Sequence, residues 1–171
     1  MHSLLQNITI DDISAFVFDF DGVMTNNLVY IDQTGSECVS CSRGDGLAFD
    51  VLRKLEKPAY ILSTEKNPVV KARAEKLQVP VLHGIRNKVS AINELVRAKK
   101  YDLRKIFYVG NDLNDYRIMQ KSGYTACPSD SHPIIKQIAS ITLQANGGDG
   151  VIRELLEEVF KLNFIEILYP E

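Results

Sequence analysis

The sequence predicts a three-layer, Rossmann-like α/β domain with a mainly parallel sheet. Short apolar runs rich in β-branched and aromatic residues alternate with amphipathic runs of helical spacing along the chain. The apolar runs carry no polar alternation, which is typical of parallel strands covered on both faces. No repeat, linker or low-complexity stretch divides the 171 residues, so we expect a single domain over residues 1–171.

The composition is that of an ordinary soluble globular protein. Hydrophobic residues make up 45% and charged residues 25%, and the net charge is −2, which argues against disorder and against nucleic-acid binding. No apolar run reaches the roughly 18 residues of a membrane span, and Met1–Ile10 lacks the features of a signal peptide. We therefore expect a cytoplasmic protein with no membrane or nucleic-acid partner.

The first predicted strand, Phe16–Phe18, ends in Asp19 and Asp21, which are followed by Gly22. In parallel sheets a crevice opens at the carboxyl ends of the strands, so these carboxylates are expected in a site. Two aspartates this close repel each other, and a divalent cation is the commonest counter-charge. The alternative from these residues alone is a polar strand exit with an Asp-Gly turn.

Residues 25–42 predict a β-hairpin flap, because two short β-like runs surround Asp-Gln-Thr-Gly. Cys38 and Cys41 have the spacing of metal ligands, but no second pair or nearby histidine completes a zinc set. Their odd spacing in an extended segment also points the thiols to opposite faces. We expect reduced thiols here, and Cys127 in the core.

Strand and helix patterns then alternate to the end of the chain. Helical patterns follow the glycine-rich segments at 43–46 and 147–150 and also occur between the strands. The expected strands are 59–62, 79–82, 105–109, 123–127 and an edge strand at 141–143; the expected helices are 47–55, 68–77, 91–96, 116–121, 133–140 and 151–160. An apolar tail, 161–171, follows, and packing on its own domain or on a neighbouring subunit both remain open.

Four strand exits carry polar groups of different kinds: the paired aspartates, Ser63-Thr64, Lys88 and the cluster at 111–115. A carboxylate can attack phosphorus only if a cation, a lysine and hydrogen-bond donors offset the repulsion between two anions. Together the exits predict a phosphoryl-transfer site. Taken singly, Ser63 and Thr64 could be turn or capping residues, and Lys88 a solvated lysine, although a cation near a helix start opposes the helix dipole.

The motif Asp-x-Asp-Gly-x-x-Thr at 19–25, Ser63, Lys88 and Gly-Asn-Asp-x-x-Asp at 110–115 resemble, in this order, the haloacid dehalogenase superfamily over nearly the whole chain. The short flap, Arg-Gly-Asp-Gly and the later Gly-Gly-Asp-Gly-x-x-Arg-Glu resemble a narrower group. That group comprises the 3-deoxy-octulosonate 8-phosphate phosphatases, the nonulosonate 9-phosphate phosphatases and the phosphatase-like domain of some CMP-sialic acid synthetases.

The resemblance implies an enzyme in which Asp19 is the nucleophile that forms an aspartyl-phosphate and Asp21 is the acid and base. Ser63 and Lys88 would hold the phosphoryl oxygens. The implied cofactor is Mg²⁺, bound by the Asp19 carboxylate, the Asp21 backbone carbonyl and the side chain at position 111. That side chain is Asn111 instead of the family's usual aspartate, so one negative charge is lost. Further metal candidates that could compensate are Asp112 and Asp115, the latter from the second shell.

The second motif, Ser63-Thr64-Glu65, departs from the Thr-Gly-Arg of octulosonate phosphatases and is similar to that of phosphatases acting on nine-carbon acids. By that similarity Glu65 and Lys76 are candidate sugar contacts, and Thr25 and Thr64 are further candidate substrate-binding residues. Arg153 and Arg43 suit an α-keto-acid carboxylate, because a guanidinium can meet it with two hydrogen bonds. The alternative for either arginine is an ordinary surface or capping role.

The resemblance also implies a homotetramer in which a neighbouring subunit's flap or tail closes the site. The leading hypothesis is a Mg²⁺-dependent phosphatase for the terminal phosphate of a nonulosonic or octulosonic acid, a small-molecule sugar-acid phosphate. The alternative is a non-catalytic tetramerising module associated with a CMP-sugar-acid synthetase, which Asn111 and the apolar tail motivate.

Overall fold

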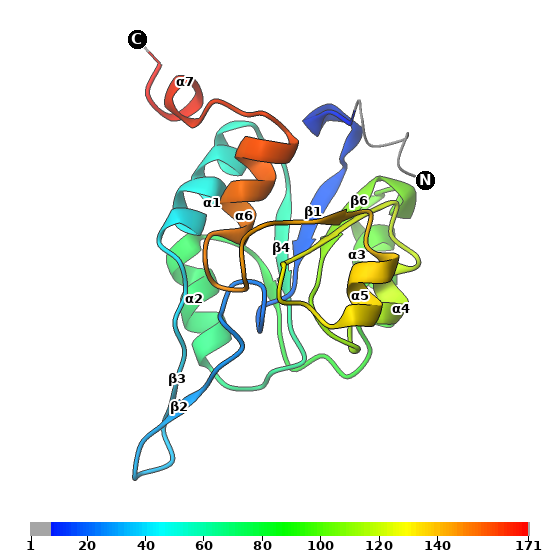
Figure 1. The fold of residues 1–171 in the computed structure, drawn as a ribbon. Helices are drawn as coiled ribbons and strands as arrows, with labels where there is room; N and C mark the ends of the chain where they lie inside the picture. The colour runs from blue at the N-terminus through cyan, green and yellow to red at the C-terminus, as the bar shows by residue number, and fades with distance from the viewer. Residues whose placement is uncertain (1–7, 171) are drawn as a thin grey trace.

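The computed structural model describes residues 8–170 as a parallel sheet covered by helices on both faces, from which a hairpin projects (Figure 1). The six strands lie in the order β5-β4-β1-β6-β7-β8, and every neighbouring pair is parallel. This confirms the predicted fold class. Of the predicted domain and of the segment Met1–Ile10, residues 1–7 and Glu171 lie outside the described part of the chain.

The strands of the sheet are short and follow the predicted positions closely. They are β1 (Ala15–Phe18), β4 (Ala59–Leu62), β5 (Val81–Leu82), β6 (Ile106–Val109), β7 (Tyr124–Cys127) and β8 (Ile141–Thr142). The helices are α1 (Gly44–Lys54), α2 (Val69–Leu77), α3 (Lys88–Lys99), α4 (Tyr116–Met119), α5 (Pro133–Ile138), α6 (Val151–Glu154) and α7 (Phe164–Leu168), with 3₁₀ turns at Ile10–Asp12 and Leu103–Lys105.

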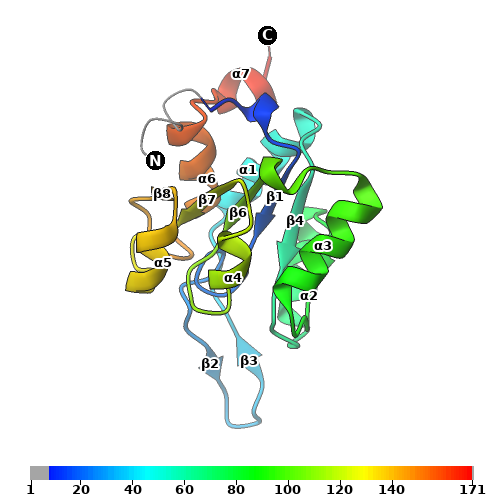
Figure 2. The same ribbon diagram turned by 90° about the vertical axis from the view of Figure 1, so that its right-hand side faces the viewer.

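Side chains of β1 alternate between the two faces of the sheet, as the pleat requires. Phe16 and Phe18 belong to the core cluster that packs under α1, α2 and α6, whereas Val17 belongs to the cluster under α3, α4 and α5. Both faces of the central strand are therefore buried. Figure 2 shows α3 and α4 in front of the sheet, with α6 behind it.

The predicted flap is present at residues 25–42, although its strands are shorter than expected. β2 (Tyr30–Ile31) pairs antiparallel with β3 (Glu37–Cys38), and an isolated bridge joins Thr25 to Cys41 at its base. Asp32 closes the turn, because its Oδ1 accepts hydrogen bonds from the backbone of Thr34 and Ser36. The hairpin projects beyond the carboxyl ends of the strands (Figure 1).

The chain after α6 differs from the prediction of one regular helix at 151–160. A π-helical turn occupies Leu155–Val159, and it ends with a hydrogen bond from the Phe160 amide to the Leu155 carbonyl. After this turn Phe160 and Phe164 both lie in the core cluster that includes the buried side chains of α1. The tail thus packs partly on its own domain, at the end of the sheet away from the flap (Figure 1).

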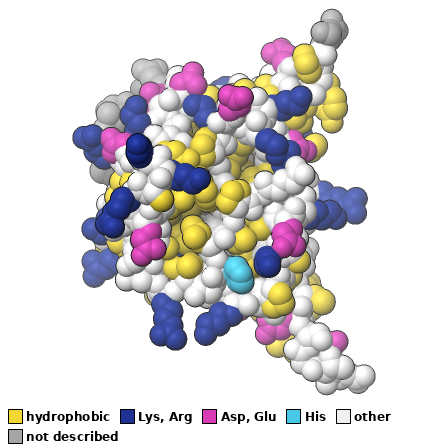
Figure 3. All heavy atoms as spheres, turned by 180° about the vertical axis from the view of Figure 1, so that it is seen from behind, with side chains coloured by type: hydrophobic (Ala, Val, Ile, Leu, Met, Phe, Trp, Pro, Cys, Tyr) yellow, Lys and Arg dark blue, Asp and Glu magenta, His cyan; other side chains and the backbone are white. Residues whose placement is uncertain are grey.

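The three cysteines are free: Cys38 is exposed, Cys41 is half-buried and Cys127 is buried, as expected. None of the helices within residues 8–170 is both long and apolar enough to cross a membrane. On the face drawn in Figure 3 hydrophobic side chains gather near the centre, and Lys and Arg side chains lie around them with acidic side chains in between. This distribution agrees with the near-neutral net charge.

Candidate active site

Asp19 lies at the carboxyl end of β1 and is only 2% exposed. Its backbone amide continues the ladder by donating to the Val109 carbonyl at 2.9 Å. Its Oδ1 accepts a hydrogen bond from the Phe20 amide at 2.7 Å. The central strand therefore fixes both the backbone and the side chain of the carboxylate that the motif singles out.

The loop after Asp19 folds back on itself around Thr25. The Thr25 hydroxyl is buried and accepts hydrogen bonds from the Gly22 amide at 3.1 Å and the Asn27 amide at 3.2 Å. Gly22 has a φ of 73°, the left-handed region that glycine adopts without strain. In the structure Thr25 shapes the loop, and its expected contact with the substrate stays a prediction.

Lys88 is the first residue of α3 and is 4% exposed. Its Nζ lies 2.8 Å from Asp19 Oδ1 and 2.7 Å from Asp115 Oδ1. The alternative of a solvated lysine is therefore wrong. A cation at a helix start is unfavourable, and here the buried carboxylates of Asp19 and Asp115 offset it. From the sequence we could expect only that some anion lies near Lys88.

Asp115 is completely buried, and donors occupy both of its carboxylate oxygens. Oδ1 accepts from Lys88 and from the Tyr108 hydroxyl at 2.6 Å, and Oδ2 accepts from the Asn111 amide at 2.9 Å. A Cβ at Gly110 would lie 2.5 Å from this carboxylate, so only glycine fits beside it. These contacts make Asp115 a support for Lys88 and for the loop after β6. Its expected indirect part in metal binding stays a prediction.

Sequence reasoning missed Tyr108, because it considered only the residues that follow the strands. The available signal was a phenol within the otherwise apolar strand β6, since a buried hydroxyl needs a hydrogen-bond partner.

Asp21, Asn111 and Asp112 line one cleft of about 240 Å³, together with Asn27, Leu113 and Asn114. Asn111 is 7% exposed, and its side-chain nitrogen lies so close to Gly22 that a Cβ there would be 1.8 Å away. The loops after β1 and β6 thus meet at this point. Within residues 8–170 no group of three or more His, Cys, Asp or Glu side chains is arranged to hold a metal ion. The side chains with oxygen atoms that line this cleft are two aspartates and three asparagines.

Burial and neighbouring charges shift the pKa values of these groups. Burial, together with the charge of Asp115, raises the pKa of Asp19 well above its usual value, and the Lys88 ammonium opposes this shift. Burial alone would lower the pKa of Lys88, but the facing carboxylates outweigh it and raise that pKa. Burial also raises the pKa of Asp21, with a further contribution from Glu65.

Ser63 ends β4 and is 1% exposed. Its Oγ accepts a hydrogen bond from the Glu65 amide at 3.0 Å, which leaves its proton available for donation to a ligand. The serine is thus a turn residue and a potential donor at once. Thr64 beside it is exposed. The Asn67 side chain donates to Glu37 at 3.0 Å and so connects this loop to the flap.

The remaining substrate candidates lie in other places. Glu65 is half-buried and accepts from the Asn67 amide at 2.7 Å. Arg43 and Lys76 line a separate cleft of about 390 Å³ between α1 and α2, together with Arg73. The exposed Arg153 donates to the Glu157 carboxylate at 3.0 and 3.1 Å, so the structure supports the alternative of a surface ion pair.

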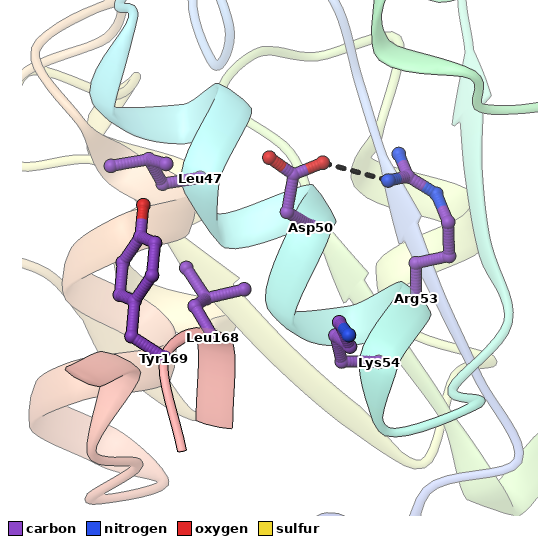
Figure 4. A pocket seen from close by; sticks show the side chains of 6 residues that line it. All are labelled: Leu47, Asp50, Arg53, Lys54, Leu168 and Tyr169. Carbon is purple, nitrogen blue, oxygen red and sulfur yellow. Dashed lines mark hydrogen bonds and ion pairs between the residues drawn. The ribbon is translucent and has the colours of Figure 1, made fainter. Parts of the chain in front are cut away.

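A further cleft, of about 310 Å³, lies between α1 and the tail. Leu47 and Tyr169 flank it, and Asp50 pairs with Arg53 at 2.7 Å on its rim (Figure 4). Its lining holds none of the residues predicted for phosphoryl transfer.

The two glycine-rich motifs support the loop after β1. A Cβ at Gly147 would lie 2.4 Å from the Gly22 carbonyl oxygen, and the Gly148 amide donates to the Val23 carbonyl at 3.0 Å. Asp130, which sequence reasoning missed, accepts from the Gly147 amide at 3.0 Å.

Asp45 of the first glycine-rich motif joins α1 to the start of α6. Its Oδ1 accepts from the Ile152 and Arg153 amides, both at 3.0 Å. The second motif is thereby held in place against the loop that carries Asp21.

Comparison with known proteins gives a consistent result. A family model described as haloacid dehalogenase-like hydrolase matches residues 54–155. The chain is 27% identical over 148 residues to the 3-deoxy-D-manno-octulosonate 8-phosphate phosphatase KdsC of Escherichia coli strain K12, covering 86% of this chain and 79% of that protein.

Two solved structures share the fold. One is a putative HAD family hydrolase from Streptomyces avermitilis MA-4680, with a TM-score of 0.87, 42% identity and coverage of 90% of this chain and 88% of that chain. The other is a 3-deoxy-D-manno-octulosonate 8-phosphate phosphatase from Moraxella catarrhalis in complex with magnesium ion, phosphate ion and KDO, with a TM-score of 0.86, 22% identity and coverage of 94% and 92%. At this identity the second likeness bears on the fold alone.

Proposed function

Because the chain belongs to the haloacid dehalogenase-like hydrolase family, we propose that it is a Mg²⁺-dependent phosphatase that removes the terminal phosphate of an octulosonic or nonulosonic acid. The relative from Escherichia coli is a phosphatase for an octulosonate 8-phosphate. The segment Ser63-Thr64-Glu65 resembles the second motif of enzymes for nine-carbon acids. The proposal therefore includes nonulosonic acids.

The observation that carries the proposal is the buried contact of Lys88 with Asp19, at 2.8 Å. A carboxylate that attacks a phosphate ester brings two anions together, and an ammonium excluded from water offsets their repulsion strongly. In this proposal Asp19 attacks phosphorus and the bond to the sugar oxygen breaks. Lys88 and the Ser63 hydroxyl would hold the phosphoryl oxygens.

Asp21 has the properties of a general acid and base. It lines the cleft with Asn111 and Asp112, and burial raises its pKa, which favours the protonated form that a general acid needs. It would give its proton to the leaving sugar oxygen. The resulting carboxylate would then take a proton from the water that hydrolyses the aspartyl-phosphate.

The residues around the cleft fit a hard cation. The Asp19 carboxylate, the Asp21 carbonyl and the Asn111 side chain would supply oxygen ligands, and Asp112 lines the same cleft. When bound, Mg²⁺ would neutralise charge on the phosphoryl oxygens. Asp115 would support the metal site without contacting the ion, because both of its carboxylate oxygens already accept hydrogen bonds.

The sugar part of the substrate would contact residues around the mouth of the site. Glu65 and Thr64 follow Ser63 directly, and Arg43 and Lys76 line the basic cleft between α1 and α2. A homotetramer would bring a neighbouring flap to this region. The exposed apolar segment Leu28–Ile31 of the flap is compatible with such a contact. The proposal also places the enzyme in the cytoplasm.

The alternative of a non-catalytic tetramerising module explains the site less well. Burying Asp19, Lys88 and Asp115 removes three charged groups from water, which is costly. A scaffold without activity has no physical need for that arrangement. Catalysis does, because the reaction requires an anion and a cation held together away from water.

The proposal is tested by measuring phosphate release from 3-deoxy-octulosonate 8-phosphate and from N-acylneuraminate 9-phosphate, with Mg²⁺ and with EDTA. We expect turnover of at least one substrate with Mg²⁺ and none with EDTA. Asp19→Asn, checked for folding by thermal unfolding, is expected to lose activity by at least about a thousandfold. Turnover that survives EDTA or Asp19→Asn would contradict the mechanism, and no turnover of either substrate by folded protein would favour the module.

A further inference from the structure

Tyr108 lies behind the candidate active site, and the proposed chemistry does not use it. Its ring is completely buried in β6, and its hydroxyl donates to Asp115 Oδ1 at 2.6 Å. The same oxygen accepts from Lys88 Nζ at 2.7 Å, and Lys88 Nζ lies 2.8 Å from Asp19 Oδ1. Four buried side chains thus form one continuous chain from the phenol to the proposed nucleophile.

The phenol shares with Lys88 a single carboxylate oxygen. A buried carboxylate oxygen attracts its donors strongly, and each added donor reduces the negative charge that the others meet. Without the phenol, Asp115 Oδ1 would be left with Lys88 as its donor and would hold the ammonium more tightly. The Lys88 ammonium would then bind Asp19 and a phosphoryl oxygen more weakly.

The strand geometry fixes the phenol in this place. Tyr108 is paired in register with Val17 of β1 and with Thr125 of β7, so its backbone belongs to the centre of the sheet. Burial, followed by the charges of Asp115 and Asp19, raises the pKa of Tyr108 well above its usual value. The hydroxyl therefore keeps its proton and remains a donor throughout the pH range in which a folded enzyme works.

We propose that Tyr108 is a positioning residue of the phosphatase reaction, which sets the location and availability of Lys88 through Asp115. This inference rests on the proposed function. A purely structural role, in which the hydroxyl only satisfies a buried carboxylate, differs from it in one respect. It predicts a loss of stability without a selective loss of charge stabilisation at the phosphoryl group.

Tyr60 provides a matched control for Tyr108. It lies in β4 within the same core cluster, is 7% exposed, and its hydroxyl bonds to that of Tyr101 at 3.1 Å. Tyr60→Phe therefore removes one buried hydroxyl and one hydrogen bond, as Tyr108→Phe does. Only the second change touches the chain of contacts that reaches Lys88.

The experiment compares wild type, Tyr108→Phe and Tyr60→Phe in steady-state kinetics, in thermal unfolding and in calorimetric binding of orthovanadate. Orthovanadate can adopt the five-coordinate geometry of phosphoryl transfer, so its affinity reports stabilisation of the transition state. For Tyr108→Phe we expect kcat/KM to fall by about tenfold or more, with a parallel loss of vanadate affinity. For Tyr60→Phe both quantities should stay within about twofold of wild type.

Unchanged kcat/KM and vanadate affinity in Tyr108→Phe, or equal losses in both variants, would overturn the inference. The binding measurement does not need turnover, so it separates this inference from the proposed function, which the activity of the wild type tests. If Tyr108→Phe does not fold, 3-fluorotyrosine at position 108 replaces it, because fluorination strengthens the phenol as a donor. A change in vanadate affinity there, but not on fluorination of Tyr60, supports the inference; no change overturns it.

Discussion

Gly22 and Asn111 are packed so closely that a Cβ atom at position 22 would lie 1.8 Å from the Asn111 side-chain nitrogen. This contact joins the loop that carries Asp21 to the loop after β6. It also presses the amide against the backbone next to the carbonyl proposed as a metal ligand. The glycine is thus required by the neighbouring loop as well as by its own φ of 73°.

Gly22→Ala is therefore expected to lose activity as well as stability. The left-handed φ should cost about 1 kcal/mol, and the clash should move Asn111 away from the cleft. Phosphatase activity and the free energy of unfolding in urea measure the two effects separately.

Gly35→Ala is the matched control, because Gly35 has a φ of 83° with no atom of the described residues within 4 Å of a Cβ. It should show a similar loss of stability, of about 1 kcal/mol, and full activity. Equal activity in the two variants would show that the contact with Asn111 is not needed for catalysis.

Asn111→Asp is expected to strengthen Mg²⁺ binding. The substitution adds a negative charge among the proposed metal ligands, which include the Asp19 carboxylate and the Asp21 carbonyl. We expect the Mg²⁺ concentration for half-maximal activity, and the dissociation constant from calorimetry, to fall by roughly tenfold.

Asn114→Asp adds the same charge to the same cleft at an exposed position. It should change the Mg²⁺ affinity much less than Asn111→Asp does. If both variants bind Mg²⁺ equally well, the added negative charge in the cleft would explain the tighter binding. Asn111 would then not be a Mg²⁺ ligand.

Lys88→Met is expected to abolish activity and to destabilise the fold strongly. Removing the ammonium leaves Asp19 and Asp115 buried without their counter-charge, and breaking a buried ion pair in this way costs about 3–5 kcal/mol. Without Lys88, whose charge opposes the shift, the pKa of the Asp19 carboxyl should rise further, so protonation of Asp19 stabilises the folded variant. The loss in the free energy of unfolding, relative to wild type, should therefore grow as the pH rises. It should shrink toward pH 4–5, which is roughly one unit above the usual pKa of an aspartate.

The surface variant Lys161→Met tests the importance of burial. Lys161 pairs with Glu158 at 3.1 Å, with both side chains largely exposed, and exposed pairs contribute about 1 kcal/mol or less. Urea unfolding of both variants between pH 4 and pH 8 measures the contrast. A loss of stability in Lys88→Met that is small, or that does not depend on pH, would contradict the buried ion pairs of Lys88 with Asp19 and Asp115.

The sequence predicted the sheet and the residues at its strand ends well, because both are local properties. Apolar runs such as Phe16–Phe18 mark buried strands, and parallel strands bring their exits to one edge. Asp19, Ser63 and Lys88 were identified for this reason. The π-helical turn at Leu155–Val159 was missed, since the same apolar spacing fits a regular helix to within one residue.

Contacts between distant segments were not predictable from local patterns. The hydrogen bonds from Tyr108 to Asp115 and from Gly147 to Asp130 depend on how strands and loops stack in space. The ion pair of Arg153 is local by contrast, because Glu157 lies one helical turn away and accepts from the guanidinium. The resemblance to sugar-acid phosphatases suggested the arginine as a substrate contact, and the structure gives it a local partner.

Asp45 leads to a prediction about the pH dependence of stability. Its carboxylate is 1% exposed, and its Oδ2 has no hydrogen-bond partner within residues 8–170. Burial raises the pKa of Asp45 to about 6, although the Ile152 and Arg153 amides and the charge of Arg73 oppose this shift. The raised pKa means that the folded state prefers the protonated carboxyl.

The sign of the effect follows from this preference. The contribution of Asp45 to stability is fully present below its unfolded pKa of about 4 and is lost as the pH rises through about 6. A shift of about two units corresponds to about 3 kcal/mol. Asp45→Asn keeps an oxygen that can accept from the two amides and cannot ionise, so this loss should be absent from the variant.

Urea unfolding of wild type and Asp45→Asn from pH 4 to pH 7.5 measures the difference. The stability of the variant relative to wild type should rise with pH, most steeply near pH 5, between the unfolded pKa of about 4 and the folded pKa of about 6, and should level off above pH 6. Asp50→Asn is the control, because Asp50 lies on the same helix in a half-exposed pair with Arg53. A difference that is flat across this range, or equally steep for Asp50→Asn, would mean that Asp45 does not ionise in a buried environment. A rise between about pH 4 and pH 6 would instead show that the carboxyl that accepts from the start of α6 titrates in the folded protein.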